Sequence, residues 1–313
     1  MKVILTGITG NLGYEVAIEL MRRGVEVVPL VRGSLPHGLS RDPARVIVGD
    51  LADGPEINFL GNVDAIVHCA GVVRFQEANG VNEKMMHKVL KLARGLKTPV
   101  YYASTAFLYR PPHTAFVPRN SYEEDKWRAE QALITSKIPY AIFLPSILTG
   151  SSANGAIRNF SGYYLVAQAF RSAIERSTVP VRFPRLSGTT NVVPVDQAAQ
   201  SIVSVVQKSG SGMFYITNPA PSTFVWFLTE TLTHFGLDDR LQFIDCSFKD
   251  FEKLPLTDTE RELVQFGKNF HPYWALDYPF PPSLCTENLV DHNYVRRILN
   301  YYQKVVPKAA ITQ

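Results

Sequence analysis

The amino-acid sequence predicts an α/β fold, with a doubly wound parallel sheet and a smaller C-terminal cap. Short apolar runs typical of strands alternate with helix-like segments through the first half of the 313 residues. This alternation is typical of a parallel sheet with helices on both faces. A glycine-rich turn joins the first strand to the first helix. Beyond Gly150 the alternation stops and prolines and aromatic residues become frequent, which indicates a separate cap.

The expected strands are short and apolar, and helical segments separate most of them. The strands are Val3–Leu5, Val25–Val31, Arg45–Val48, Ala65–Cys69, Val100–Ala103, Ala141–Leu144 and Met213–Ile216. The helices are Tyr14–Arg23, Asn82–Leu96, Tyr122–Ser136 and a segment that opens at Asn191–Asp196 and reaches about Lys208. We therefore expect residues 1–150, joined by 191–216, to form the sheet domain, and residues 151–190 and 217–313 to form the cap.

The composition narrows the class of protein. A hydrophobic content of 46% with 19% charged residues is ordinary for a globular enzyme. No run approaches the roughly 20 apolar residues of a transmembrane helix, so we expect no integral membrane segment. The net charge of +4 is scattered, which argues against a nucleic-acid partner. Three widely spaced cysteines, and seven histidines without metal-ligand spacing, predict a cytoplasmic protein with no disulfide and no metal.

The glycine turn between the first strand and the first helix has the features of a phosphate cradle. Gly7 permits a tight turn, Gly10 lets the backbone approach phosphates, and Gly13 lets helix and strand pack closely. The helix N-terminus then offers amide groups and the positive end of its dipole to a pyrophosphate. A glycine turn without a ligand is the alternative. The predicted phosphate-binding residues are Gly7, Thr9, Gly10, Asn11, Leu12 and Gly13.

Residues at the ends of the next strands predict which dinucleotide is bound. Arg32 ends the second strand, where an acid would bind the ribose 2′-hydroxyl and an arginine accommodates a 2′-phosphate, so NADP is favoured over NAD. A solvated arginine is the alternative. Asp50 and Leu51 follow the third strand and are expected to flank the adenine. Ala70 and Gly71 follow the fourth and are small enough to lie against the cofactor.

A second group of residues points to proton-transfer chemistry. Thr105 lies at the end of the fifth strand, and Tyr122 and Lys126 share one face of the following helix because they are four residues apart. An ammonium beside a phenol favours the phenolate, and lowering the phenol pKa from about 10 to about 7 is worth roughly 4 kcal/mol. We therefore expect Tyr122 to be an acid/base with a lowered pKa, with the Thr105 hydroxyl holding a substrate carbonyl beside it.

These motifs together resemble the extended short-chain dehydrogenase/reductases over essentially the whole chain. The resemblance is carried by Thr6–Gly13, Asp50-Leu51, Ser104-Thr105-Ala106 and Asn120–Lys126. It implies a Rossmann dinucleotide-binding domain with Thr105, Tyr122 and Lys126 as the catalytic trio. It also implies that Asn82 is the family's helix asparagine, that the backbone at Pro145-Ser146 meets the nicotinamide carboxamide, and that a homodimer is possible.

Further segments look closest to one branch of this family, the fatty acyl-CoA and thioester reductases. They are Leu30–Arg32, His68–Phe75, Ala103–Ala106, Tyr122–Glu130, Asn159–Tyr164 and Val192–Asp196. Three features depart from the family pattern. Met85-Met86 replaces a Gly-Thr pair, Asp125 replaces a Ser or Thr before the lysine, and only 16 residues separate Thr105 from Tyr122.

The predicted function is that of an NADP-dependent oxidoreductase. Hydride would pass to a carbonyl or acyl thioester of an apolar small-molecule substrate, Tyr122 would protonate the nascent alkoxide, and Lys126 would orient the cofactor ribose. Two alternatives stay open: a sugar-nucleotide epimerase or dehydratase, and a catalytically silent NADP-binding sensor. Ala106-Phe107 stands where a dehydratase has an acidic pair, and Arg32 argues against an epimerase, which would usually retain NAD.

Two features of the cap also leave alternatives. Its many aromatic residues are expected either to form core or to line an apolar substrate pocket. The last segment, Asn288–Lys308, is expected to be a docking helix with a solvated basic face or a peripheral membrane contact.

Overall fold

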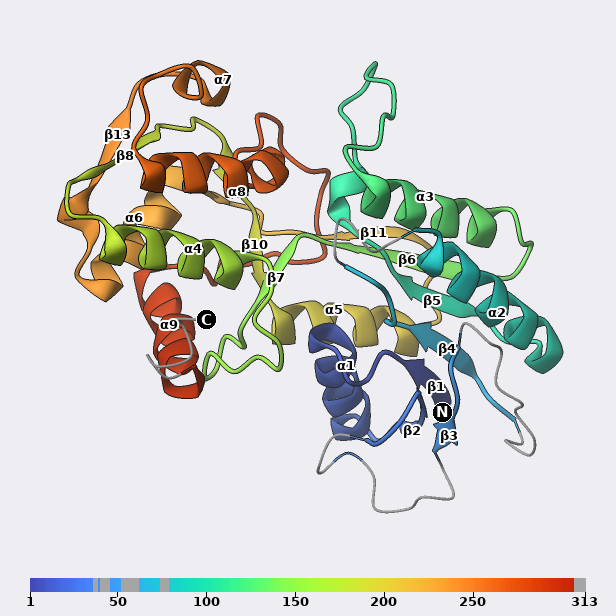
Figure 1. The fold of residues 1–313 in the computed structure, drawn as a ribbon. Helices are drawn as coiled ribbons and strands as arrows, with labels where there is room; N and C mark the ends of the chain where they lie inside the picture. Colours follow the sequence, from blue (N-terminus) through green and yellow to red (C-terminus); the bar gives the residue numbers. More distant parts are fainter. Residues whose placement is uncertain (36–38, 40–45, 52–61, 74–78, 307–313) are drawn as a thin grey trace. The chain divides into compact units, whose positions relative to one another are not determined.

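The computed structural model of the protein describes residues 1–35, 39, 46–51, 62–73 and 79–306, and it divides into two compact units (Figure 1). The first unit consists of Met1–Ser146, Val195–Thr217 and Pro282–Cys285. The second consists of Ile147–Pro194, Asn218–Pro281 and Thr286–Gln313. The sequence pattern did not predict that Pro282–Cys285, within the expected cap, belong to the first unit.

A seven-stranded sheet of parallel strands forms the centre of the first unit. The strand order is β11-β6-β5-β4-β1-β2-β3. The strands are β1 (Lys2–Thr6), β2 (Glu26–Val31), β3 (Ile47–Val48), β4 (Ala65–His68), β5 (Val100–Ala103), β6 (Tyr140–Pro145) and β11 (Gly212–Ile216). The predicted fold class is therefore confirmed. Because the chain moves outward from β1 to β3 and then returns to β4 on the other side of β1, the strand order reverses between β1 and β4, where such sheets bind ligands.

Helices cover both faces of this sheet (Figure 1). On one face α1 (Asn11–Arg22) packs against α5 (Val195–Gln207), and on the other α2 (Val81–Leu96) packs against α3 (Ser121–Ile134). A short 3-10 helix, η2 (Ala106–Leu108), follows β5. The buried sides of the helices and the central strands form the core of this unit.

The helix expected to open at Asn191 begins instead at Val195. The preceding residues form β10 (Val192–Pro194), which pairs in parallel with β7 (Ile147–Thr149). Two β-branched valines favour the extended backbone there, and the pairing satisfies their backbone polar groups. Of the segments named above, Arg45, Arg74-Phe75 and residues 307–308 lie outside the described residues.

The second unit is built mainly from helices, with three sheets of two strands each among its described residues. Its further strands are β8 (Val181–Pro184), β9 (Thr189–Thr190), β12 (Ser222–Thr223) and β13 (Leu241–Ile244). The sheets pair β10 with β7, β12 with β9, and β13 with β8. Its helices are α4 (Tyr163–Arg176), α6 (Phe224–Phe235), η3 (Asp238–Arg240), α7 (Phe248–Phe251), α8 (Asp258–Trp274) and α9 (His292–Val305).

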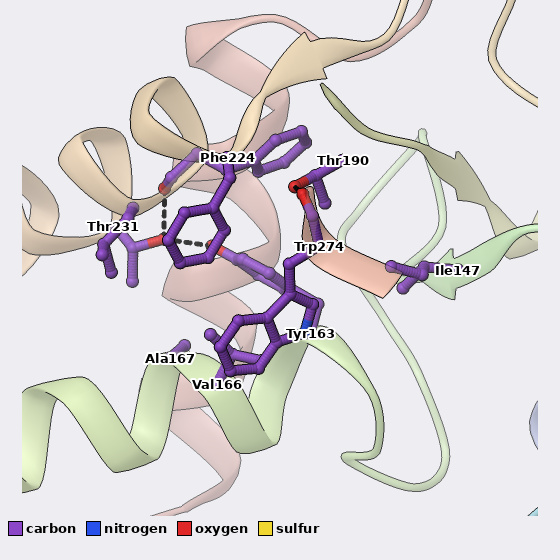
Figure 2. Close-up of a pocket in the computed structure, with 10 residues that line it drawn as sticks. Ile147, Tyr163, Val166, Ala167, Thr190, Phe224, Thr231 and Trp274 are labelled. Carbon is purple, nitrogen blue, oxygen red and sulfur yellow. Dashed lines mark hydrogen bonds between the residues drawn. The ribbon is translucent and has the colours of Figure 1, made fainter. Parts of the chain in front are cut away.

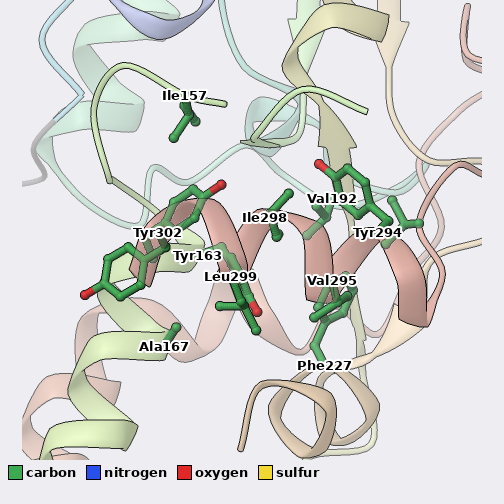
Figure 3. Packing of buried hydrophobic residues seen from close by; sticks show 12 residues of the cluster. Ile157, Tyr163, Ala167, Val192, Phe227, Tyr294, Val295, Ile298, Leu299 and Tyr302 are labelled. Carbon is green, nitrogen blue, oxygen red and sulfur yellow. The ribbon is translucent and has the colours of Figure 1, made fainter. Parts of the chain in front are cut away.

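The last helix, α9, packs its apolar side into the core of this unit against α4 and α6 (Figure 3). The Tyr294 hydroxyl donates to the Gly150 carbonyl (2.7 Å), and the Gly150 amide donates to the Tyr164 hydroxyl (3.0 Å). Arg296 and Lys304 are exposed on the other side of the helix. In the part of the chain that the structure describes, no helix is both long enough and apolar enough to cross a membrane.

A buried ion cluster fixes the start of α3, and the sequence analysis did not identify it. The Glu123 side chain is fully buried, and its two carboxylate oxygens accept from Arg110 (2.7 Å) and Arg119 (2.8 Å). The Arg119 backbone amide also donates to Glu123 (2.9 Å). Both guanidinium groups donate to the Phe107 carbonyl. The cluster thus attaches the segment between η2 and α3 to the first turn of α3.

Replacing Glu123 by Gln should lower the free energy of unfolding by about 3 kcal/mol, because two half-buried guanidinium groups lose their common counter-ion. Urea denaturation followed by circular dichroism measures this change. Glu124→Gln is the matched control, since the adjacent Glu124 forms an exposed pair with Arg128 and such pairs contribute little. Equal, small losses in both variants would contradict the stabilising role of the cluster.

Candidate cofactor and active site

The glycine turn lies directly against the segment that follows β4. Gly7 has φ +77°, and a β-carbon there would lie 2.4 Å from the Ala70 amide nitrogen. The Gly10 amide donates to the Gly7 carbonyl (2.9 Å) and closes the turn. Gly13, in the first turn of α1, packs closely against the glycine turn. A β-carbon on Gly13 would lie 2.2 Å from the Gly7 carbonyl oxygen. At Gly7 and Gly13, therefore, a side chain would collide with the backbone.

A pocket of about 850 Å³, partly open to solvent, lies over this turn. It contains eight of the predicted cofactor residues: Gly7, Thr9, Gly10, Arg32, Asp50, Leu51, Ala70 and Gly71. Gly10 precedes α1 and no side chain caps the helix there, so the positive end of the α1 dipole lies at the pocket. The part of the pocket formed by the glycine turn, at the N-terminal end of α1, therefore fits the pyrophosphate of a dinucleotide.

Other predicted residues do not line the pocket. Asn11 and Leu12 lie in the first turn of α1, and Gly13 packs under the turn. Pro145 ends β6, and Ser146 follows it with its amide bonded to the Ile216 carbonyl (3.1 Å). Tyr122 and Lys126 also lie outside the pocket lining.

The pocket also contains residues that the sequence analysis did not select. They are Thr6, Ile8, Leu30, Val31, Gly49, Cys69, Val72, Val81 and Met85. Most of them adjoin a predicted residue at a strand end, which is the signal that could have found them. Met85 has no such signal: it comes from α2, and its side chain reaches the pocket from the helix.

Thr105 and Tyr122 are buried and interact directly. Thr105 follows β5, where its hydroxyl accepts from the Phe107 amide (3.4 Å). Tyr122 lies in the first turn of α3, which Asn120 caps through the Glu123 amide (3.0 Å). The Thr105 hydroxyl hydrogen-bonds the Tyr122 phenol. The structure therefore brings these two predicted residues together at the carboxyl end of β5.

Lys126 lies one turn further along α3 and reaches the back of the cofactor pocket. Its Nζ donates to the Ala103 carbonyl (3.1 Å) and lies 4.9 Å from the centre of the Tyr102 ring. A β-carbon on Gly71 would lie 3.0 Å from this same Nζ. Because Gly71 lines the pocket, Lys126 connects the pocket wall to the helix that carries Tyr122.

The predicted lowering of the Tyr122 pKa is wrong in this structure. Burial raises the pKa of Tyr122 to about 12, an effect that the Thr105 hydroxyl opposes and that the Glu123 and Glu130 carboxylates reinforce. The Lys126 ammonium donates to a backbone carbonyl, and desolvation of a phenolate outweighs any attraction to it. Burial also lowers the pKa of Lys126 to about 8 and raises that of Glu130 to about 7.

The second unit contains a small, apolar hollow that has room for little more than a water molecule (Figure 2). Phe224 and Trp274 stack with their ring centres 5.3 Å apart at its wall. The Tyr163 hydroxyl is paired with Thr231 (2.6 Å), which donates in turn to the Phe227 carbonyl (2.7 Å). Since these polar groups are paired with one another, the pocket presents mainly hydrocarbon. Other aromatic residues of this unit are fully buried core: Phe170, Phe183 and Phe251.

Comparisons with known proteins identify relatives of the chain. Residues 51–202 match the model of the male sterility protein family, a family of NAD-binding domains. The hybrid PKS-NRPS synthetase pvhA of Talaromyces variabilis is 24% identical over 237 residues, which are 66% of this chain and 6% of that protein. The chain thus spans less than a tenth of the length of this curated relative.

Two solved structures share the fold. A thiolation-reductase di-domain from an archaeal non-ribosomal peptide synthetase superposes with a TM-score of 0.68 at 16% identity, over 97% of this chain and 75% of that one. UDP-N-acetylglucosamine 4-epimerase from Bacillus cereus superposes with a TM-score of 0.62 at 20% identity, over 96% and 99% of the two chains. At these identities the likeness concerns the fold. Residues 51–202, just under half of the chain, match the male sterility protein type, and the fold is the one that the reductase di-domain and the epimerase share.

Proposed function

We propose that the protein is an NADPH-dependent reductase that acts on the carbonyl of an apolar aldehyde, ketone or acyl thioester. The observation that carries the proposal is the buried Thr105–Tyr122 hydroxyl pair: Tyr122 lies on α3, and Lys126 of the same helix lies directly behind the pocket wall. A proton donor and a cofactor site are thereby joined through one short helical segment.

Residues that line the pocket, together with residues next to it, suit each part of NADPH. Amides of the glycine turn and of Asn11 and Leu12 would hold the pyrophosphate, and Arg32 would hold the 2′-phosphate. Asp50 and Leu51 would flank the adenine, and Ala70 and Gly71 would lie against the cofactor. Lys126 would bind the ribose, and the backbone at Pro145 would meet the carboxamide. NADPH, when bound, supplies the hydride.

The chain's own residues would handle the substrate oxygen and its proton. Thr105 and Tyr122 would bind the carbonyl oxygen through their hydroxyl groups. A phenol with a pKa of about 12 is protonated at pH 7, so Tyr122 enters the reaction as a proton donor. This protonation state suits reduction, in which the developing alkoxide takes the phenol proton.

The apolar substrate class is supported by the pocket of the second unit. The lining of this small hollow is hydrocarbon with internally paired hydroxyls, a chemistry that suits an aliphatic or aromatic group better than a sugar. We assign residues 151–190 and 217–313 the role of a substrate cap on this basis. Similarity to a thiolation-reductase di-domain supports an acyl thioester as the reacting group.

The Tyr122→Phe variant should lower kcat by about 10²- to 10⁴-fold, because the proton donor is lost. Its Kd for NADPH should stay within about twofold, since Tyr122 does not line the pocket. NADPH oxidation with a panel of aldehydes, ketones and acyl thioesters measures turnover, and fluorescence titration measures binding. Tyr140→Phe, at the start of β6, is the control and should behave as wild type. Unchanged turnover in Tyr122→Phe would rule out the mechanism.

The Arg32→Ala variant should bind NADPH about tenfold to a hundredfold more weakly and NADH unchanged, because only NADPH carries the 2′-phosphate. Isothermal titration with both cofactors measures this, with Arg94→Ala on the exposed end of α2 as control. Equal affinity of the wild type for NADPH and NADH would remove the role of Arg32. It would also favour the alternative of a sugar-nucleotide epimerase, which interconverts sugar nucleotides without net NADPH oxidation.

A further inference from the structure

The N-terminus of α2 is capped by a side chain from a different helix. Gly80 precedes α2 with φ +78° and has no side chain to offer the first-turn amides. Asp125 of α3 caps α2 instead. Its Oδ2 accepts from the Asn82 backbone amide (2.9 Å), and its Oδ1 accepts from the Glu83 backbone amide (3.0 Å). Only 2% of Asp125 is exposed. A buried carboxylate at this end of a helix is stabilised by the amide groups and the helix dipole.

The same carboxylate also fixes the Asn82 side chain. The Nδ2 of Asn82 donates to Asp125 Oδ2 (2.8 Å) and to the Val72 carbonyl (3.1 Å). The Oδ1 of Asn82 accepts from the Val72 amide (2.9 Å). Asn82 thus satisfies both backbone groups of Val72, and Asp125 accepts from the same side-chain amide group and supports this orientation.

The backbone held in this way is a wall of the cofactor pocket. Ala70, Gly71 and Val72 all line the pocket. A β-carbon on Gly71 would lie 3.0 Å from both Asn82 Oδ1 and Lys126 Nζ. The side chains of Asn82 and Lys126 therefore fill the space directly behind the wall and fix its position.

We propose that Asp125 is a positioning residue for the dinucleotide: acting through Asn82, it holds the Gly71–Val72 wall in the conformation that binds the cofactor. The proposal rests on the proposed function, since it concerns affinity for the same pocket. All three atoms that face Asp125 are donors, so an acceptor-only carboxylate satisfies them together. An asparagine here would turn its NH₂ group toward at least one of these donors.

The test compares Asp125→Asn, Asn82→Ala, the double variant and the control Glu124→Gln by titration with NADPH. We expect Asp125→Asn and Asn82→Ala each to weaken binding about tenfold. The double variant should be no weaker than Asn82→Ala alone, because the two residues act in series. Glu124→Gln should bind as wild type. If the role of Asp125 were purely structural, the variants would have a lower melting temperature. Their Kd for NADPH, measured well below that temperature, would equal that of the wild type.

Hydrogen exchange of the protein without cofactor gives an independent measurement. The Val72, Asn82 and Glu83 amides should exchange faster in Asp125→Asn than in Glu124→Gln, and the same should hold in Asp125→Ser if Asp125→Asn does not fold. Unchanged exchange at Val72, additive effects on the Kd, or an unchanged Kd in Asp125→Asn would overturn the positioning role alone. A wild-type protein that binds neither NADPH nor NADH would overturn the proposed function and, with it, this proposal.

Discussion

The backbone contact between Gly7 and the Cys69–Ala70 peptide is the constraint on which the candidate site depends. It joins the ends of β1 and β4, the two neighbouring strands between which the strand order reverses. A β-carbon at Gly7 would lie within 2.5 Å of the Cys69 carbonyl carbon, so any other residue would push the two strand ends apart. The Thr6 hydroxyl reinforces the contact, since it accepts from the Ala70 amide (3.2 Å) and pairs with the buried His68 ring (2.7 Å). The pocket exists because backbone, rather than side chains, forms its floor.

Burial is the dominant influence on the ionisable groups near this floor. Lys126 and Glu130 are almost fully buried, and desolvation favours the neutral form of each side chain. It lowers the pKa of Lys126 to about 8 and raises the pKa of Glu130 to about 7. The same effect raises the pKa of Tyr122. The charge of Lys126 and its one-turn spacing from Tyr122 are visible in the sequence, whereas desolvation is not. For this reason the sequence predicts Tyr122 near Thr105 but the wrong direction for the pKa of Tyr122.

Much of the fold could be predicted from local patterns, whereas contacts between distant side chains could not. The range Val100–Ala103 was predicted to the residue, because this buried strand is a continuous apolar run with Pro99 before it and Ser104 after it. The glycine spacing likewise identified the turn, since backbone crowding allows no other residue there. By contrast, Asp125 caps a helix that begins 44 positions earlier in the chain, and Glu123 binds arginines of a segment without regular structure. Composition and periodicity contain no information about such pairings. Met85 was missed for the same reason: only the packing of α2 determines that it faces the pocket.

The first two turns of α3 illustrate how these contacts combine. Successive residues of a helix point about 100° apart, so adjacent side chains face different neighbours. Tyr122 meets Thr105, Glu123 meets two arginines, Asp125 meets α2, and Lys126 meets β5. The rotation of α3 about its axis is therefore determined by four buried contacts and not by the one-turn spacing of Tyr122 and Lys126 alone. Contacts on four sides oppose rotation or sliding of this helix. The position of the Tyr122 hydroxyl is thus a property of the folded unit, and such a fixed position is what the proposed role of Tyr122 as proton donor requires.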